Sequence, residues 1–196
     1  MLDTRQELFE HELRDLYDAE KKLDRALETM SKKVSDRTLS KSFTNHRITT
    51  KEQVKRLEQI FKSLDRKPRR EPCRGINGLV NEFTEFVKKE EPSEEILDAF
   101  ATGAALKVEQ YEIVAYRSII RLAGQLGATE AIDLLTRSLA EEEKTAQALE
   151  AMADQLAGPL TLASQNEDPV VVRDVIAREV VLPEAEDSVA RSEPLP

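Results

Sequence analysis

Lys107-Val108-Glu109-Gln110-Tyr111-Glu112-Ile113-Val114-Ala115-Tyr116 is the segment from which the architecture of this 196-residue chain is best inferred. Apolar residues recur around it at helical spacing, and one acidic residue, Glu112, interrupts their row. The predicted inward row is Ala105, Val108, Glu112, Ala115, Ile119 and Leu122. A buried carboxylate without a partner is unfavourable, so it must be neutralised, paired with a cation or bound to a metal. The segment therefore predicts a core helix that carries a functional group.

Three other helical patterns are interrupted in the same way. Glu20, His46 and Glu142 each occupy a position where the apolar row of their own helix predicts a hydrocarbon side chain. On a helix rich in Glu and Lys, a single such residue is more often part of a solvated face. Four separate helices that each place a metal-ligand type of residue near mid-helix favour a shared site.

The order of helices indicates the fold. Thr4 and Glu7 form a capping box that opens the first helix, and Ser35 or Asp36 caps the second. A Pro-containing crossover over 65–75 leads to a short helix over 76–89. Ser93 starts the third long helix, and Thr129 is the predicted cap of the fourth. Two helical hairpins joined by a long crossover predict an all-α, ferritin-like up-down four-helix bundle with a short crossover helix.

The chain is predicted to divide into a bundle domain, residues 1–157, and a C-terminal extension, residues 158–196. Val-rich residues 170–181 predict a short helix or strand within the extension. The residues after it are acidic and contain Pro, which is typical of a loose segment. Because the Val-rich segment is too apolar to be wholly free, we expect it to dock on the bundle or on a partner subunit.

Composition excludes several classes of function. A net charge of −9 argues against a nucleic-acid partner, and the basic residues between Arg66 and Arg70 lie in a loop that we expect to be solvated. No apolar run approaches the roughly 20 residues of a membrane span. The single cysteine, Cys73, cannot form an intramolecular disulfide, and the N-terminus lacks the apolar region of a signal peptide. A cytoplasmic location is therefore expected.

The interrupted rows predict a metal site in the bundle core. Its predicted ligands are Glu20, His46, Glu109, Glu112 and Glu142. Carboxylates with an imidazole suit Fe, Mn or Zn, and we expect Fe or Mn in a mononuclear or dinuclear centre. Glu141 is an alternative to Glu142, and the predicted supporting donors are Tyr17, Gln53 and Tyr111. In the competing interpretation, the acids pair with Arg or Lys or remain protonated.

The residues that carry these ligands are similar to those of a known family. Residues 8–156 resemble the YciE/YciF-like bacterial stress proteins, a branch of the ferritin-like superfamily. The most specific matching segments are Glu12–Leu23, with Glu-Leu-Arg-Asp-Leu-Tyr-Asp-Ala-Glu-Lys-Lys-Leu, and Lys107–Tyr116. Phe43, His46 and the Glu141-Glu142 pair add to the match. The resemblance implies a ferritin-like bundle, a homodimer, a link to stress responses and a metal pair held by the five residues predicted above.

The sequence departs from the family pattern at two positions. Thr49 stands where the family tends to place a carboxylate, and Gln110 stands where it tends to place a His. Neither the second nor the fourth helix carries the Glu-x-x-His motif of di-iron bundles. Two functions from different classes are weighed first: a metal-binding stress protein that oxidises Fe(II) or handles peroxide, or a non-catalytic interaction protein with a vestigial site. A third, an iron store, would need a cage-forming oligomer, which nothing in the sequence indicates.

Overall fold

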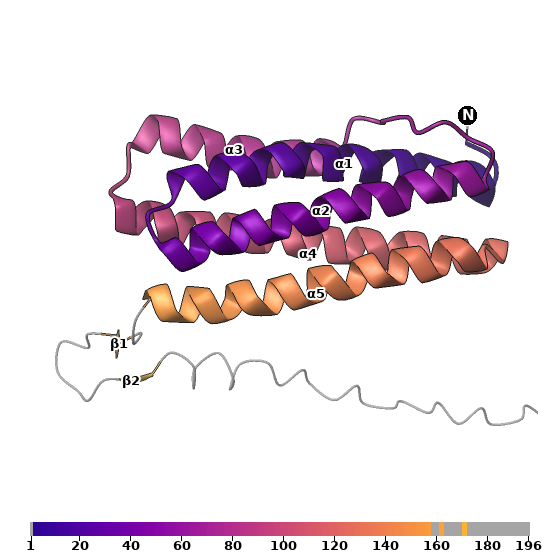
Figure 1. The fold of residues 1–196 in the computed structure, drawn as a ribbon. Coiled ribbons are helices and arrows are strands. Elements are labelled where there is room, and N and C mark those ends of the chain that lie inside the picture. Colours follow the sequence, from indigo (N-terminus) through magenta and orange to yellow (C-terminus); the bar gives the residue numbers. More distant parts are fainter. Residues whose placement is uncertain (1, 158–160, 163–169, 172–196) are drawn as a thin grey trace, which may run out of the picture. The chain divides into compact units, whose positions relative to one another are not determined.

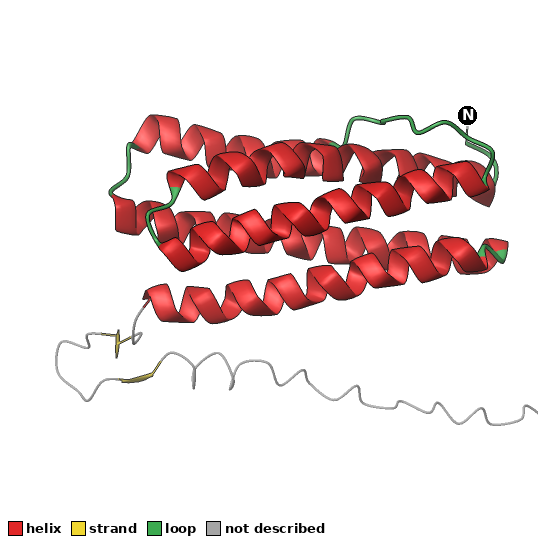
Figure 2. Ribbon diagram, in the orientation of Figure 1, coloured by secondary structure: helices red, strands yellow, loops and turns green. Residues whose placement is uncertain are grey.

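The computed structural model describes residues 2–157, 161–162 and 170–171. Five helices make up the first part: α1 (Arg5–Lys33), α2 (Arg37–Ser63), α3 (Arg74–Glu90), α4 (Glu94–Leu126) and α5 (Thr129–Ala157) (Figures 1 and 2). The contacts divide the chain into two units, residues 1–157 and residues 158–196. In the second unit, β1 (Thr161–Leu162) pairs antiparallel with β2 (Val170–Val171).

The four long helices form an up-down bundle. The most extensive contacts join α1 to α2 and α4 to α5, and further contacts join α1 to α4 and α2 to α5. The crossover helix α3 packs against α1 and α4 on the outside of the bundle (Figure 1). The predicted fold class, a ferritin-like bundle with a short crossover helix, is confirmed. No helix in the described part of the chain has the length and apolar character that a membrane crossing requires.

Local hydrogen bonds explain where the helices begin and end. The predicted capping box is present: the Glu7 amide donates to Thr4 Oγ1 over 3.1 Å, and the Thr4 amide donates to Glu7 Oε2 over 2.9 Å. Asp36 caps α2 by accepting a hydrogen bond from the Leu39 amide over 2.7 Å. Thr129 is already the first residue of α5, because the Ala128 carbonyl accepts the Ile132 amide proton. The predicted cap at Thr129 is thus displaced by one residue.

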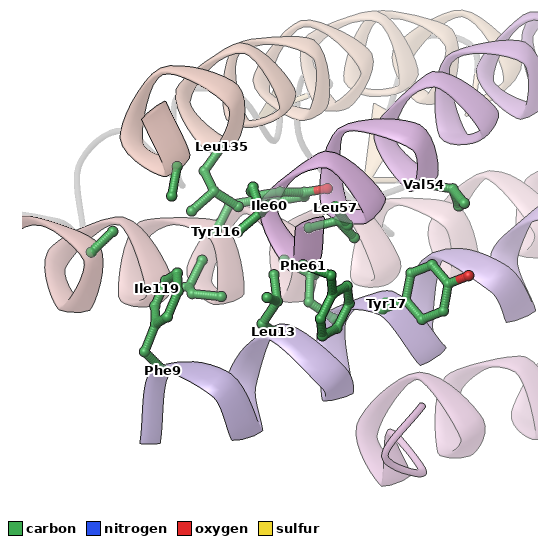
Figure 3. Packing of buried hydrophobic residues seen from close by; sticks show 13 residues of the cluster. Phe9, Leu13, Tyr17, Val54, Leu57, Ile60, Phe61, Tyr116, Ile119 and Leu135 are labelled. Carbon is green, nitrogen blue, oxygen red and sulfur yellow. The ribbon is translucent and has the colours of Figure 1, made fainter. Parts of the chain in front are cut away.

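Two apolar clusters occupy the two ends of the bundle and leave a polar layer between them, and a third, smaller cluster of Ala19, Leu23, Cys73 and Ile76 joins α1 to α3. In α1 one cluster extends to Tyr17 and the other begins at Leu27. In α5 the first ends with Leu139 and the second begins at Leu149. Figure 3 shows the first cluster. It is centred on Phe9, Leu13, Leu57, Ile60, Phe61, Ile119 and Leu135. The predicted ligands Glu20 and Glu142 therefore lie in the gap between two hydrocarbon layers.

The inward face of α4 is turned slightly from its predicted orientation. Glu112 and Ile119 are buried as expected, whereas Val108, Ala115 and Leu122 are only half-buried. The buried positions are Asp98, Ala101, Thr102, Ala104, Ala105, Glu109, Glu112, Ile113, Tyr116, Ile119 and Ala123. The rotation brings Glu109 fully into the core, on the same face as the small side chains of Ala101 and Ala105. Most of the predicted 170–181 segment lies outside the described residues.

Candidate metal centre

Four of the five predicted ligands converge in the polar layer. His46 from α2, Glu109 and Glu112 from α4, and Glu142 from α5 each offer a ligand atom, and these atoms all lie within 4.8 Å of one another. All four residues are buried. Residues three apart on a helix project to neighbouring positions, so Glu109 and Glu112 reach the same point from one helix. Three carboxylates and an imidazole gathered in this way are a set of donors that could hold a metal ion.

His46 lies between two of the acids. Its Nδ1 atom is 3.3 Å from Glu109 Oε1, and its Nε2 atom is 3.6 Å from Glu142 Oε2. Burial lowers the pKa of His46 to about 4, so the imidazole is neutral near pH 7. A neutral imidazole has a free lone pair, which is the form that binds metal.

The carboxylates lack the partners that buried charges require. Hydrogen-bond partners are absent for both oxygens of Glu112 and for one oxygen each of Glu20, Glu109 and Glu142. Within residues 2–157, none of these four acids forms an ion pair with Lys or Arg, although two lie near His46. The competing interpretation by Arg or Lys pairing therefore does not describe them. What remains is a proton or a metal ion, and these residues fit a metal.

Burial and mutual repulsion favour protonation of the acids in the absence of a cation. Burial raises the pKa of Glu20 and Glu109 well above the usual range, and the nearby Glu142 carboxylate raises both further. Burial also raises the pKa of Glu112, with Glu20 as the next cause. Burial raises the pKa of Glu142 to about 7. Clustered acids with such raised pKa values are typical of functional sites.

Glu20, the fifth predicted ligand, is held by Tyr116. The Tyr116 hydroxyl donates a hydrogen bond to Glu20 Oε1, and both residues are fully buried. Burial raises the pKa of Tyr116 well above its usual range, so the hydroxyl remains a donor. Sequence reasoning gave Tyr116 no role in the site. Tyr116 follows Glu112 by one helical turn on the same face of α4, and this spacing could have indicated that it lies beside the acids.

Of the three predicted supporting residues, Gln53 is beside a ligand. Its Nε2 atom donates to Glu142 Oε1 and, over 3.2 Å, to Glu141 Oε2. The hydroxyl of Tyr17 instead donates to Glu58 over 2.8 Å, and that of Tyr111 lies 3.3 Å from the Cys73 sulfur. The two tyrosines therefore bond outside the carboxylate cluster. Their faces of α1 and α4 point to other helices, which sequence spacing alone does not reveal.

The neighbouring acid Glu141 has a different partner. Arg56 binds both of its oxygens, over 2.7 and 2.6 Å. This bidentate pair directs Glu141 away from the cluster, and Glu142 is the α5 acid that faces inward. The choice of Glu142 over Glu141 agrees with the predicted ligand set.

The two departures from the family pattern differ in position. Gln110 is exposed, so a substitution there leaves the carboxylate layer intact. Thr49 is half-buried and lines a groove together with His46. The loss of an acid at Thr49 therefore affects the edge of the site near His46, whereas the loss of a His at Gln110 affects the surface.

Two cavities reach the cluster from different sides. A groove of about 430 Å³ between α2 and α5 includes His46, Thr49 and Glu141 in its lining, beside several other charged and polar side chains. An apolar pocket of about 270 Å³ between α1, α3 and α4 has Glu109 in its wall. The centre is thus buried but is approached by two routes, of which the groove between α2 and α5 is the less apolar.

Known proteins share this chain's sequence and fold. The model of a family described as "Domain of unknown function (DUF892)" matches residues 4–159. The YciF protein of Escherichia coli K12 is 38% identical over 145 residues, which are 74% of this chain and 87% of that protein. The crystal structure of the E. coli stress protein YciF aligns with a TM-score of 0.75 at 36% identity, over 79% of this chain and 98% of that one. YcfI of Rhodopseudomonas palustris, proposed to be a structural protein, aligns with a TM-score of 0.74 at 36% identity, over 76% and 94% of the two chains.

Proposed function

This chain belongs to the DUF892 family of YciF-like proteins, and from that premise we propose that it is a stress-associated metal-binding protein that oxidises Fe(II) with O₂ or a peroxide. One observation carries the proposal: His46, Glu109, Glu112 and Glu142 converge within 4.8 Å, and within residues 2–157 no Lys or Arg forms an ion pair with these acids. Such a cluster is stable with the acids ionised only if a cation joins them.

The residues have distinct roles in this proposal. Glu109, Glu112 and Glu142 hold the metal through carboxylate oxygens, and His46 adds a nitrogen ligand. Glu20 extends the set toward a second ion, because it is fully buried in the same polar layer and one of its carboxylate oxygens has no hydrogen-bond partner. A bound Fe or Mn ion supplies redox chemistry and an open coordination position.

Neighbouring side chains orient these ligands. Tyr116 fixes Glu20, and Gln53 fixes Glu142, each through a donated hydrogen bond. Arg56 holds Glu141 in a bidentate pair and so keeps a second negative charge outside the cluster. Residues of this kind set the position and basicity of metal ligands.

A second function is favoured by one relative. YcfI is proposed to be structural, and raised pKa values allow the four acids of this chain to exist as neutral groups without a metal. In that case the bundle would act through its surface, as an interaction protein with a vestigial site. A homodimer is part of either proposal.

Metal analysis separates the two functions. Protein purified without chelators is analysed for Fe and Mn per chain, beside Glu20→Ala, Glu112→Ala and the exposed control Glu150→Ala. The metal-binding function predicts about one to two ions per chain in the wild type and the control, and a loss in the two core variants. Metal far below one per chain, unchanged in all variants, would reject the site.

A further inference from the structure

The apolar pocket between α1, α3 and α4 is not explained by metal binding alone. Its volume of about 270 Å³ lies just below the roughly 300–1,000 Å³ usual for small-ligand sites. Its walls include Leu27, Met30, Val80, Phe83 and Ala104. Glu109, a proposed metal ligand, belongs to the same wall. A hydrocarbon in this pocket would therefore lie beside the centre.

Small side chains on two helices leave this space. Ala26 on α1 and the neighbours Ala104 and Ala105 on α4 line the pocket, so the crossover helix α3 covers the bundle without filling it. Val80 and Val108 are half-buried at its sides, and the exposed residues Arg25 and Asn77 border it. The pocket is thus apolar inside and polar at its rim.

The route on the other side of the centre has more charged and polar side chains in its walls, beside the apolar Ala148 and Met152. The groove between α2 and α5 is lined by hydroxyl, amide and charged groups, including Lys41, Asn45 and Lys144, and it reaches His46. His46 Nδ1 lies 3.3 Å from Glu109 Oε1, so both routes end at the same cluster. Ions and water have a polar route of their own, and the apolar route is available to an organic molecule.

We propose that the apolar pocket binds the hydrocarbon part of an alkyl hydroperoxide, with the peroxide group directed toward Glu109. This inference rests on the proposed function and names the class of oxidant for that site. The O–O bond breaks and the hydroperoxide takes up two electrons and two protons, which yields the alcohol and water. Two Fe(II) ions supply the electrons and become Fe(III), and the protons come from solvent. O₂ and H₂O₂ have no hydrocarbon part to bury against these walls.

A binding experiment on metal-free protein tests the pocket apart from the chemistry. The probe is 2-phenyl-2-propanol, the alcohol formed from cumene hydroperoxide, titrated into chelator-treated full-length protein and followed by NMR. Val80→Phe fills the pocket from α3, away from the ligands, and Val108→Phe fills it from α4. Val114→Phe is the matched control, because Val114 is 62% exposed on α4 and lies outside the pocket. We expect about tenfold or more weaker binding in the two pocket variants and no change in the control.

A kinetic experiment tests the oxidant. Fe(II)-loaded protein is compared with cumene hydroperoxide and with H₂O₂, and the ratio of the two kcat/KM values is measured. The ratio should favour cumene hydroperoxide in the wild type and in Val114→Phe, and fall about tenfold in Val80→Phe. An unchanged ratio in Val80→Phe would overturn the proposal.

The outcomes separate this inference from the function on which it rests. If the protein binds Fe(II) but not the alcohol, the pocket assignment is overturned and metal binding stands. If it binds the alcohol, and binds it more weakly in the two pocket variants, but binds no metal, the proposed function is wrong. The assignment of an alkyl hydroperoxide as the oxidant is then wrong as well. Alcohol binding that is equally strong in all three valine variants would place the ligand elsewhere and overturn the pocket.

Discussion

Replacement of Glu112 by Leu should stabilise the metal-free protein. Both carboxylate oxygens of Glu112 are buried without a hydrogen-bond partner, and the pKa of the group is raised by burial and by Glu20. Removing a buried, unsatisfied polar group of this kind is worth about 1–3 kcal/mol. At ~2 kcal/mol, a domain of this size should gain roughly 4–8 °C in melting temperature. Glu150→Leu, at an exposed position of α5, is the control and should change stability by less than about 0.5 kcal/mol.

Added metal should make the wild type more stable than Glu112→Leu. A ligand that binds only the folded state stabilises it by RT ln(1 + [L]/Kd), which reaches ~2 kcal/mol near 30 times Kd and ~4.1 kcal/mol at 1,000 times Kd. The wild type should therefore overtake Glu112→Leu as Mn(II) is added, because the variant has lost a ligand. The assay is thermal unfolding in chelator and across a Mn(II) titration. A variant that is destabilised in chelator, or that gains as much from Mn(II) as the wild type, would refute the reasoning.

The stability of the metal-free protein should also fall as pH rises from about 4.5 to about 7. The folded state raises the pKa of Glu142 from 4.5 to about 7, so in this window it holds a proton that the unfolded chain has released. Stability then decreases with pH, by at most ~1.4 kcal/mol per pH unit for each such proton. Glu20, Glu109 and Glu112 act in the same direction. His46 has the opposite effect, because its pKa falls from 6.5 to about 4 in the folded state. Between these pH values it makes stability rise with pH, but it is one group against four acids. Urea unfolding in chelator at several pH values measures the net slope, and a rise in stability over this window would contradict the raised pKa values.

Three further substitutions test the residues that support the site and the packing of α3. Tyr116→Phe removes the donor to Glu20, so metal affinity measured by Mn(II) titration should fall about 10- to 100-fold; an unchanged affinity would exclude Glu20 from the ligand set. Gly75→Ala should destabilise by about 1–3 kcal/mol in urea unfolding, because a Cβ there would lie 2.3 Å from the Tyr111 ring. Gly78→Ala in the same helix is the control: an added Cβ there has nothing within 4 Å, so this change should stabilise the protein by roughly 0.5–1 kcal/mol. Equal effects of the two substitutions would show that Gly75 is not packed tightly against the Tyr111 ring.

The acids at the centre show how far the sequence could predict the site. Glu112 and Glu142 interrupt apolar rows, and that signal depends only on helical periodicity within each helix. Glu109 was placed through its spacing from Glu112 and the family resemblance, and the structure shows it fully buried. Tyr17 and Tyr111, which spacing placed near the ligands, bond to Glu58 and Cys73 because each lies on a face that meets a different neighbour.

The sequence by itself determined the number and bounds of the main helices, the crossover and the acids that face the core. These follow from periodicity, capping residues and Pro-containing loops, which act over a few neighbouring residues. Only the tertiary structure decided that Tyr116 holds Glu20, that Arg56 draws Glu141 away from Glu142, and that two cavities with different side chains in their walls reach the centre. A helix turns about 100° per residue, so a small rotation exchanges which side chains meet across the bundle, and only the packing of all the helices together sets that rotation.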